Sequence, residues 1–517
     1  MKTITISQEE YHKFKAQEQY INELEHEKKF LMEQLKLLRK ARFGSKSERA
    51  VYLNQLSIDN LFDEAEVFSD PEREEPKFAD VIQVPAHTRK KKSVKEQLPD
   101  DIPVVERHHY LDEEGCVCPH CSATMEEIGT ETRSTLGIAP AKVFEIRDIC
   151  HVYACKACDK EAEPVTVRKA SFPAAVIPGG IASPEAIANV INDKFVLGTP
   201  LYRQEQYWQR QGVMLSRQTM SNWLLYAVDH YLKAIYDKLH RDLIQEDILH
   251  ADETELQVLR EEGKSPQSKS YMWLYRTGAF AKTPIVLYRY ERDRRHCRPH
   301  DFLEGFSGFL HSDGYEAYHK LEHVVSIGCF AHVRRKFVEA AEVATKHKGS
   351  SNLASKAVAD IRQIFAWEEQ FAKLTAEERF RKRLEKQKPL MEGFFHWLEG
   401  LIVAPKSALG RAIYYALGQK EYILNLYQDG RLELTNSRSE RSLKPFVIGR
   451  KNFLFANTPR GATASAILYS LVETAKETGV DPYQYFVFTL GEAAALRAAG
   501  KVDKIAELTP SYFKNLS

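Results

Sequence analysis

The chain has 517 residues, of which 43% are hydrophobic and 28% are charged, and this composition is typical of a water-soluble protein with several domains. Lys and Arg (73) almost balance Asp and Glu (72), so the total charge argues neither for nor against a nucleic-acid partner. We do not expect this chain to be a membrane-spanning or secreted protein, because no apolar run reaches about 18 residues and the N-terminal segment lacks the apolar core of a signal peptide. We therefore expect a cytoplasmic protein.

Residues 1–50 are predicted to form a leucine-zipper coiled coil that ends in the basic motif A-R-F-G-S-K-S-E-R. Apolar residues recur in steps of three and four between Phe14 and Arg39, which favours a homodimer or a higher oligomer. An amphipathic helix that packs on its own chain is the alternative. Residues 51–105 pass from an acidic to a basic composition with few aromatic residues, which predicts a disordered linker.

Residues 106–170 are predicted to form a zinc ribbon. Six of the eight cysteines lie between Cys116 and Cys158, and in a reducing compartment such a cluster indicates metal binding rather than disulfides. The motifs C-P-H-C and C-K-A-C offer four thiolates for a closed tetrahedral structural Zn²⁺. The predicted ligands are Cys118, Cys121, Cys155 and Cys158. Possible substitutes nearby are Cys116, His120, Cys150 and His151, and free buried thiols are the alternative.

Residues 171–242 are predicted to form a helix-turn-helix-like DNA-binding region. Ser183 and Pro184 have the pattern of an N-cap followed by a first-turn proline. Further on, a helix, a tight turn at Gly212 and a second helix capped by Ser216 follow in order. A plain helical hairpin is the alternative. The residues of the second helix that can reach bases or phosphates are Arg217, Gln218 and Asn222.

Residues 243–336 carry the first part of a predicted catalytic domain. Strands are expected at 248–258, 271–276 and 284–289, followed by a helix at 294–306, a strand ending in L-H-S-D-G-Y, and a last strand at 324–330. This is the element order of an RNase H-like fold, in whose known families the first and fourth strands are neighbours. Asp252 and Asp313 would then meet, and paired carboxylates suit Mg²⁺ and two-metal phosphoryl transfer. Taken singly, each Asp is more often a solvated strand-end residue.

The motif G-C-F-A-H-V-R-R-K-F follows the fifth strand. Cys329 and His332 have ligand-like spacing, but two groups do not make a zinc site, so we expect them to pack beside the active site. The basic residues after them, Arg334, Arg335 and Lys336, are predicted to contact DNA.

Residues 337–434 are predicted to be an inserted helical subdomain, because a compact connection needs only about 2 to 6 residues. Residues 435–490 then complete the catalytic domain, and 491–517 form a C-terminal tail. Glu440 lies early in a predicted helix, with Lys444 one turn further on the same face. The basic residues of this segment with predicted DNA contacts are Arg441, Lys444, Arg450 and Lys451.

The ordered motifs together resemble the large transposase of the bacterial insertion-sequence family numbered sixty-six. They include P-L-Y-R-Q-E-Q, H-A-D-E-T, S-D-G-Y, E-R-S-L-K-P-F-V-I-G-R-K-N-F-L-F, Y-S-L-V-E-T-A-K and D-P-Y-Q-Y, besides the motifs quoted above. The resemblance implies a multidomain α+β DDE transposase, in which Asp252, Asp313 and Glu440 hold two Mg²⁺ (or Mn²⁺) ions. Water and then the freed 3′-hydroxyl attack phosphodiesters, without a covalent protein intermediate.

The resemblance also implies double-stranded DNA partners, namely element ends and target DNA, together with small companion proteins and a nucleoid-associated location. Members of the family usually have an Asn pair before the glutamate, where this chain has Asn436 and Ser437. Two alternatives stay open at this point. One is a catalytically inactive DNA-binding protein with a zinc ribbon and a helix-turn-helix, and the other is a hydrolytic nuclease of the same fold.

Overall fold

The computed structural model describes residues 143–154, 167–346 and 353–516. The predicted coiled coil, the linker and the four predicted zinc ligands lie outside these residues. Close to the C-K-A-C motif, β1 (Val152–Ala154) and β2 (Val167–Lys169) pair as an antiparallel ribbon. No helix among the described residues is long and apolar enough to cross a membrane.

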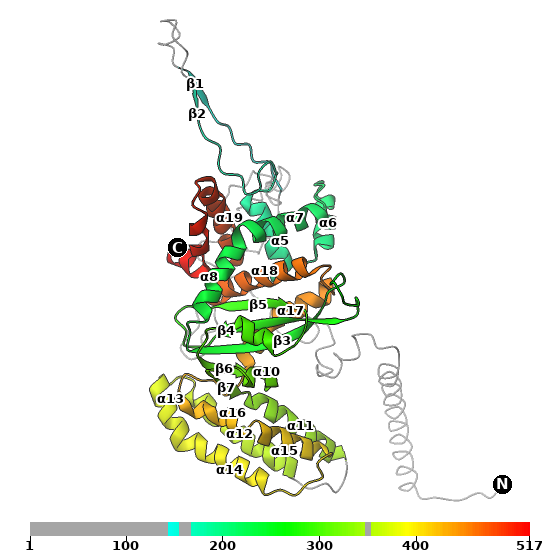
Figure 1. The fold of residues 1–517 in the computed structure, drawn as a ribbon, viewed down its shortest axis with the longest axis vertical. Coiled ribbons are helices and arrows are strands. Elements are labelled where there is room, and N and C mark those ends of the chain that lie inside the picture. Colours follow the sequence, from blue (N-terminus) through cyan, green and yellow to red (C-terminus); the bar gives the residue numbers. More distant parts are fainter. Residues whose placement is uncertain (1–142, 155–166, 347–352, 517) are drawn as a thin grey trace, which may run out of the picture. The chain divides into compact units, whose positions relative to one another are not determined.

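A five-stranded mixed sheet lies at the centre of the unit that spans residues 142–517 (Figure 1). Its order is β5-β4-β3-β6-β7, with antiparallel pairing among β3, β4 and β5 and parallel pairing among β3, β6 and β7. The predicted adjacency of the first and fourth of these strands is therefore confirmed. The strands are β3 (Ile248–Gln257), β4 (Lys269–Thr277), β5 (Val286–Glu291), β6 (Gly308–Ser312) and β7 (Val324–Gly328).

The helix predicted at 294–306 is shorter in the structure, where α9 spans Cys297–Phe302. Residues before it form a turn instead, because the Asp293 carboxylate accepts the N–H of Arg295 and pairs with the Arg298 guanidinium. Beyond the end of α9 at Phe302, the left-handed backbone of Gly305, with φ of +85°, is incompatible with a helix that continues to Phe306. The sequence pattern missed this because side-chain turn chemistry competes with helix propensity.

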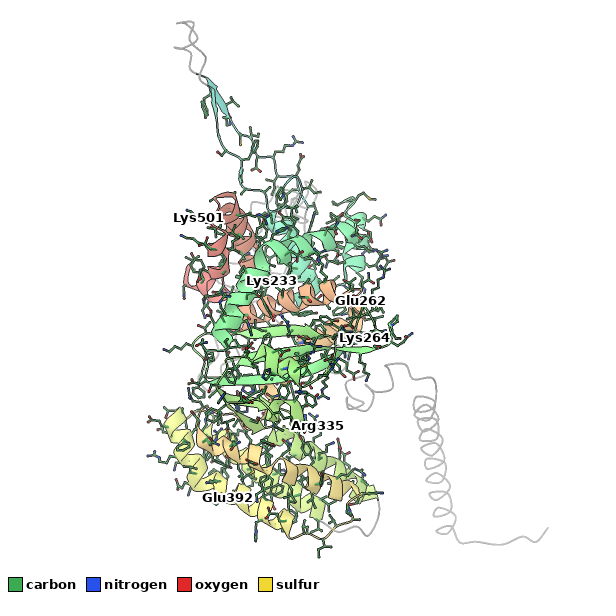
Figure 2. The ribbon with its side chains drawn as sticks, viewed as in Figure 1. Lys233, Glu262, Lys264, Arg335, Glu392 and Lys501 are labelled. Carbon is green, nitrogen blue, oxygen red and sulfur yellow. The ribbon has the colours of Figure 1, made fainter. Side chains whose placement is uncertain are left out.

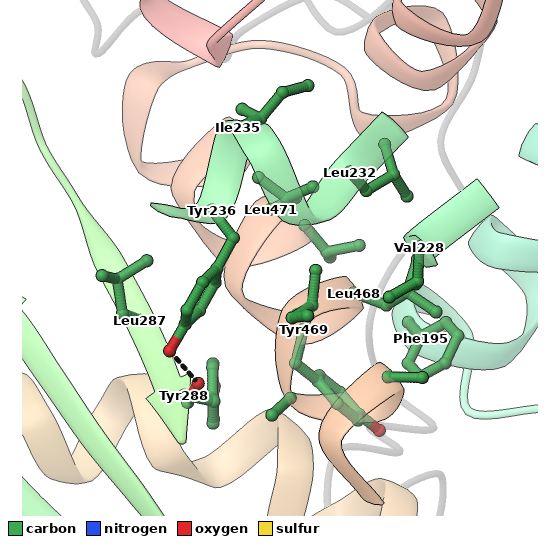
Figure 3. Packing of buried hydrophobic residues seen from close by; sticks show 14 of the residues in the cluster. Phe195, Val228, Leu232, Ile235, Tyr236, Leu287, Tyr288, Leu468, Tyr469 and Leu471 are labelled. Carbon is green, nitrogen blue, oxygen red and sulfur yellow. Dashed lines mark hydrogen bonds between the residues drawn. The ribbon is translucent and has the colours of Figure 1, made fainter. Parts of the chain in front are cut away.

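Helices α8 (Lys233–Leu243) and α18 (Pro459–Thr478) pack against β5. Figure 3 shows Leu468 and Leu471 of α18 beside Leu232, the last residue of η4 (Val228–Leu232), in a core that is closed to solvent. The hydroxyl of Tyr236 is paired in this core, because it donates to the Tyr288 carbonyl at 2.9 Å. Buried polar groups need such partners, so α8 is fixed to the sheet in one register.

Helix α18 also supplies hydroxyl groups to the outer edge of β5. Thr474 Oγ1 accepts the N–H of Val286 and donates to its carbonyl, both at 3.0 Å, and Ser470 Oγ accepts the N–H of Tyr288 at 2.7 Å. The backbone groups of an edge strand are thus satisfied by a helix rather than by another strand.

The predicted helix starts before the sheet are confirmed. Ser183 caps α5 (Pro184–Ile191) and Ser216 caps α7 (Arg217–Ala227), each by accepting a backbone N–H three residues on. Gly212, with φ of +79°, lies in the turn between α6 (Leu201–Arg210) and α7. The remaining elements of this helical region are η3 (Asn192–Val196), η4 (Val228–Leu232), α19 (Pro482–Ala498), η7 (Val502–Glu507) and α20 (Pro510–Leu516).

Between β7 and α17 (Ser437–Phe453), the chain forms a helical array with its own hydrophobic core. The first helix begins at Phe330, so the basic segment at 334–336 is helical. Inside the array, the fully buried Arg383 is paired with Glu368 and donates to the Leu432 carbonyl at 2.9 Å. The helices are α11 (Phe330–Lys346), α12 (Leu353–Phe371), α13 (Ala376–Lys382), η5 (Arg383–Gln387), α14 (Lys388–Glu399), α15 (Ala408–Gly418), α16 (Lys420–Leu424) and η6 (Asn425–Gln428).

Candidate active site

Asp252 and Asp313 lie at equivalent positions of two paired parallel strands. The register of β3 and β6 aligns His250 with His311, and each aspartate follows two residues later in its own chain segment. Asp252 is still within β3, whereas Asp313 directly follows β6 and accepts the N–H of Tyr315 at 3.0 Å. The sheet therefore delivers one carboxylate from a rigid strand and one from the turn beside it.

Asp252 lies within electrostatic range of three other acidic groups, Glu253, Asp313 and Glu440. Burial raises the pKa of Asp252 well above its usual value, and the negative charges of Glu253, Asp313 and Glu440 raise that pKa further. One hydrogen bond lowers the pKa of Asp252, because its Oδ1 accepts the backbone N–H of Glu253 at 2.9 Å. Charge repulsion among buried carboxylates is relieved by a bound cation, and oxygen ligands of this kind suit Mg²⁺.

Glu440 reaches the site from the first turn of α17. Its Oε1 is buried and has no hydrogen-bond partner among the described residues, as expected of an oxygen that a ligand would satisfy. The helix start is fixed by Asn436, whose Nδ2 donates to the Ala251 carbonyl at 2.8 Å and whose Oδ1 lies 3.0 Å from Nδ1 of His250. Asn436 thus ties α17 to the strand residue next to Asp252.

Cys329 and His332 lie directly beside Glu440, and the ligand atoms of these three residues are all within 4.8 Å of one another. Asp252 and Asp313 are not members of this tight group. Burial raises the pKa of the Cys329 thiol to about 11 and lowers the pKa of His332. The sequence placed both residues beside the active site but did not reveal their contact with Glu440, which depends on how α17 docks against the end of β7.

The neighbouring acids that compete with Glu440 for a metal-binding role have other partners. Glu253 follows Asp252 on β3 and is held by Arg294 and by the hydroxyl of Tyr318. Glu316, at the start of α10 (Glu316–His319), is exposed and pairs with Lys320 at 2.7 Å. Neither carboxylate is therefore in a position comparable to that of Glu440. Burial raises the pKa of Glu253, and the negative charge of Asp313 raises it further.

Behind the carboxylates lies a buried pair of histidines that the sequence did not reveal. His250 and His311 stack with ring centroids 4.2 Å apart, and Nε2 of His250 lies 2.9 Å from Glu433. Burial alone would raise the pKa of Glu433, but His250 and Arg438 outweigh it and lower that pKa. The alternating pattern of β3 and β6 places both histidines inward, which is the only sequence signal for this pair.

The residues predicted to contact DNA lie on the surface of three helices. Arg334, Arg335 and Lys336 are exposed on α11, the helix that carries His332, and Figure 2 shows Arg335 at this surface. Arg441 and Lys444 are exposed on α17, whose last turn holds Arg450 and Lys451. On α7, Arg217, Gln218 and Asn222 are exposed, while Met220, Trp223 and Leu224 face the core. Figure 1 shows α7 and α11 on opposite sides of the sheet.

Comparison with known proteins adds three family matches. The model described as "Transposase IS66 family" matches residues 179–464, which include all three carboxylates. A model described as "Transposase C of IS166 homeodomain" matches residues 30–107, and the "zinc-finger binding domain of transposase IS66" matches residues 115–159. The last range contains the four predicted zinc ligands.

Two similar proteins come from Sinorhizobium fredii. The "Uncharacterized protein y4hP" is 29% identical over 502 residues, which cover 93% of this chain and 88% of that protein. The "Uncharacterized protein y4qI" is 30% identical over 403 residues, which cover 75% of this chain and 72% of that protein.

These family matches identify a transposase, a DNA-binding class of protein. Because the first family match covers more than half of the sequence, the chain belongs to the IS66 transposase family.

Proposed function

We propose that the chain is a DDE transposase whose RNase H-like domain uses Asp252, Asp313 and Glu440 to hold two Mg²⁺ or Mn²⁺ ions. The observation that carries this proposal is the placement of Asp252 and Asp313 two residues beyond the paired His250 and His311 of two parallel strands, with Glu440 acting electrostatically on Asp252 from α17. Repelling carboxylates kept together in a folded protein are suited to bind hard divalent cations. The strand order and the parallel pairing of β3 with β6 support the fold assignment.

Two such ions, when bound, stabilise the attacking and the leaving oxygen of an in-line phosphodiester exchange. The residues of this chain would hold the site in place: Asp252 from a strand, Asp313 from a turn and Glu440 from a helix. Exposed Arg334 and Arg335 on the neighbouring helix would attract the DNA backbone. Water first cleaves the element end, and the freed 3′-hydroxyl then attacks target DNA, so no protein nucleophile is needed.

The test compares Glu440→Gln with Glu316→Gln in Mg²⁺- or Mn²⁺-dependent cleavage of DNA that carries the element ends. Glu440→Gln should lower cleavage at least about a hundredfold, because it removes a charge that acts on the transition state. Glu316→Gln is the matched control and should cleave normally, with end binding retained by both variants. Near-normal cleavage by Glu440→Gln would remove this residue from the proposed site.

The same assay separates the alternatives. A DNA-binding protein without chemistry would bind ends and cleave nothing, whereas a hydrolytic nuclease would cleave without joining. Incubation of pre-cut ends with a target plasmid decides between nuclease and transposase, because only a transposase forms the joined product.

We propose further that α7 contributes to binding the element ends. Its exposed face carries Arg217, Gln218 and Asn222, and its opposite face is buried. Arg217→Ala combined with Asn222→Ala should weaken end binding and reduce its salt dependence by about one phosphate contact. Equal affinity and an equal salt slope in the double variant would contradict the proposal.

The remaining proposals concern regions outside the described residues. A structural Zn²⁺ would be held by Cys118, Cys121, Cys155 and Cys158, and metal analysis of Cys155→Ser with Cys158→Ser tests this ligand set. The N-terminal segment would form a homodimer or a higher oligomer, and small companion proteins would assist the element. Chromatographic mass with and without residues 1–50 tests the oligomer.

A further inference from the structure

A second set of ligand atoms lies beside the proposed magnesium site. Cys329 at the end of β7, His332 in the first turn of α11 and Glu440 in the first turn of α17 bring their ligand atoms within 4.8 Å of one another. Tetrahedral zinc has bonds of about 2.0 to 2.3 Å, which place neighbouring ligand atoms about 3.3 to 3.8 Å apart. Small side-chain rotations are therefore enough to close this set around one ion.

Two of the three residues offer polar atoms that lack a partner among the described residues. Nδ1 of His332 and Oε1 of Glu440 are buried without a hydrogen bond. Leaving such an atom unsatisfied costs about 1 to 3 kcal/mol, so a ligand that binds both atoms has a clear energetic basis.

The third residue is placed like a metal-bound sulfur. Cys329 Sγ accepts the backbone N–H of Asn436 at 3.2 Å, and hydrogen bonds of this kind orient metal ligands and tune their basicity. Cys329 and Glu440 are held on separate elements that meet at Asn436, so the set is defined by tertiary packing rather than by one helix.

We infer that Cys329, His332 and Glu440 bind one thiophilic divalent cation, Zn²⁺ or Co²⁺. Sulfur and imidazole ligands select such ions over Mg²⁺, which prefers oxygen. Three protein ligands leave one coordination position open, unlike the four-ligand set proposed for the ribbon. The ion bound here therefore exchanges more readily than a structural zinc.

Glu440 belongs both to this site and to the proposed magnesium site, so zinc binding here would regulate DNA cleavage. When zinc occupies the Cys329–His332–Glu440 site, the carboxylate is withdrawn from Asp252 and Asp313, and Mg²⁺-dependent cleavage is inhibited. This consequence rests on the proposed function, whereas the binding of the ion does not.

Cobalt binding to the full-length protein tests the site without DNA. We expect wild type to bind one more Co²⁺ than Cys329→Ser, and the difference spectrum to show sulfur-to-cobalt charge transfer. The ribbon cysteines bind the same amount of Co²⁺ in both proteins, so their contribution cancels in the difference. Cys297→Ser is the matched control, because Cys297 is a free thiol on α9 outside the cluster, and it should match wild type.

Equal cobalt stoichiometry in wild type and a folded Cys329→Ser would overturn the inference. Circular dichroism checks the fold, and His332→Gln replaces Cys329→Ser in the same measurement if the serine variant does not fold. As a second readout, zinc should inhibit cleavage by wild type at least about tenfold more strongly than cleavage by Cys329→Ser. Absence of all cleavage would count against the proposed function and would leave the cobalt result intact.

Discussion

Asn436 is a buried residue that links three segments of the candidate active site. Its side chain contacts the Ala251 carbonyl and His250, and its backbone N–H donates to Cys329. Asn436→Ala leaves at least two buried groups without partners, each at a cost of about 1 to 3 kcal/mol. We expect the free energy of unfolding to fall by about 2 to 4 kcal/mol in urea denaturation, and cleavage to fall with the displacement of Glu440.

Asn425→Ala serves as the matched control for this prediction. Asn425 also donates to a strand carbonyl, that of Ser326 at 3.0 Å, but it is only partly buried and lies away from the carboxylates. A loss of about 0.5 to 1.5 kcal/mol is expected with cleavage retained. Equal losses of stability and activity in the two variants would show that Asn436 has no special positioning role.

His311 gives the fold a defined pH dependence. Burial lowers its pKa well below 6.5, and the neighbouring His250 lowers it further. The unfolded chain then binds a proton that the folded chain does not, so stability is full above about pH 6.5 and falls as the pH decreases below that value. The slope from this group is about 1.4 kcal/mol per pH unit. Unfolding free energies measured between pH 7 and 5 should show a shallower decline for His311→Gln, and parallel declines would contradict the assignment.

At the scale of elements, the helical insertion supports the loop that carries Asp313. The Tyr415 hydroxyl of α15 donates to the Asp313 carbonyl at 3.0 Å. Beside it, a Cβ on Gly314 would lie 2.7 Å from the side-chain oxygen of Gln419. The insertion thus packs directly against the candidate active site, because it supports the turn that carries Asp313.

Gly314→Ala tests this coupling. The added methyl group must displace the end of the Gln419 side chain or shift the Asp313 turn, so we expect cleavage to fall several-fold while end binding is retained. Gly263→Ala is the matched control, because Gly263 has a similar left-handed backbone, with φ of +71° against +91°, and open space around it. Both variants share the backbone strain of about 1 to 2 kcal/mol, so only the contact differs. Equal activities would contradict a supporting role for α15 and α16.

The sequence predicted elements better than contacts between them. The strands around Asp252 and Asp313 were found because their apolar runs have strand periodicity, and the caps at Ser183 and Ser216 because capping is local chemistry. The contact of Cys329 with Glu440 and the stacked histidines depend on docking of distant segments. Local periodicity carries no information about such docking, so these features appear only in the folded chain.

At the scale of the whole molecule, both edges of the central sheet are covered by side chains from helices. Ser470 and Thr474 of α18 bind the backbone of β5, and Asn425 binds the Ser326 carbonyl of β7. Ser470→Ala combined with Thr474→Val should leave two buried N–H groups of β5 without partners and lower the free energy of unfolding by about 1 to 3 kcal/mol for each group, measured by urea denaturation. Thr478→Val is the control, because its hydroxyl donates only to its own helix at the Thr474 carbonyl, and it should lose less stability than the double variant.

This cover on β5 comes late in the chain, since α18 begins at Pro459. A gene copy interrupted before that point would produce a protein that still has all five strands, but the backbone groups of the edge strand β5 would lack their partners on α18. We expect such a product to aggregate and to be degraded, rather than to persist in the cell and occupy element ends. Broken copies of the gene would then be silent instead of acting as dominant inhibitors of intact ones.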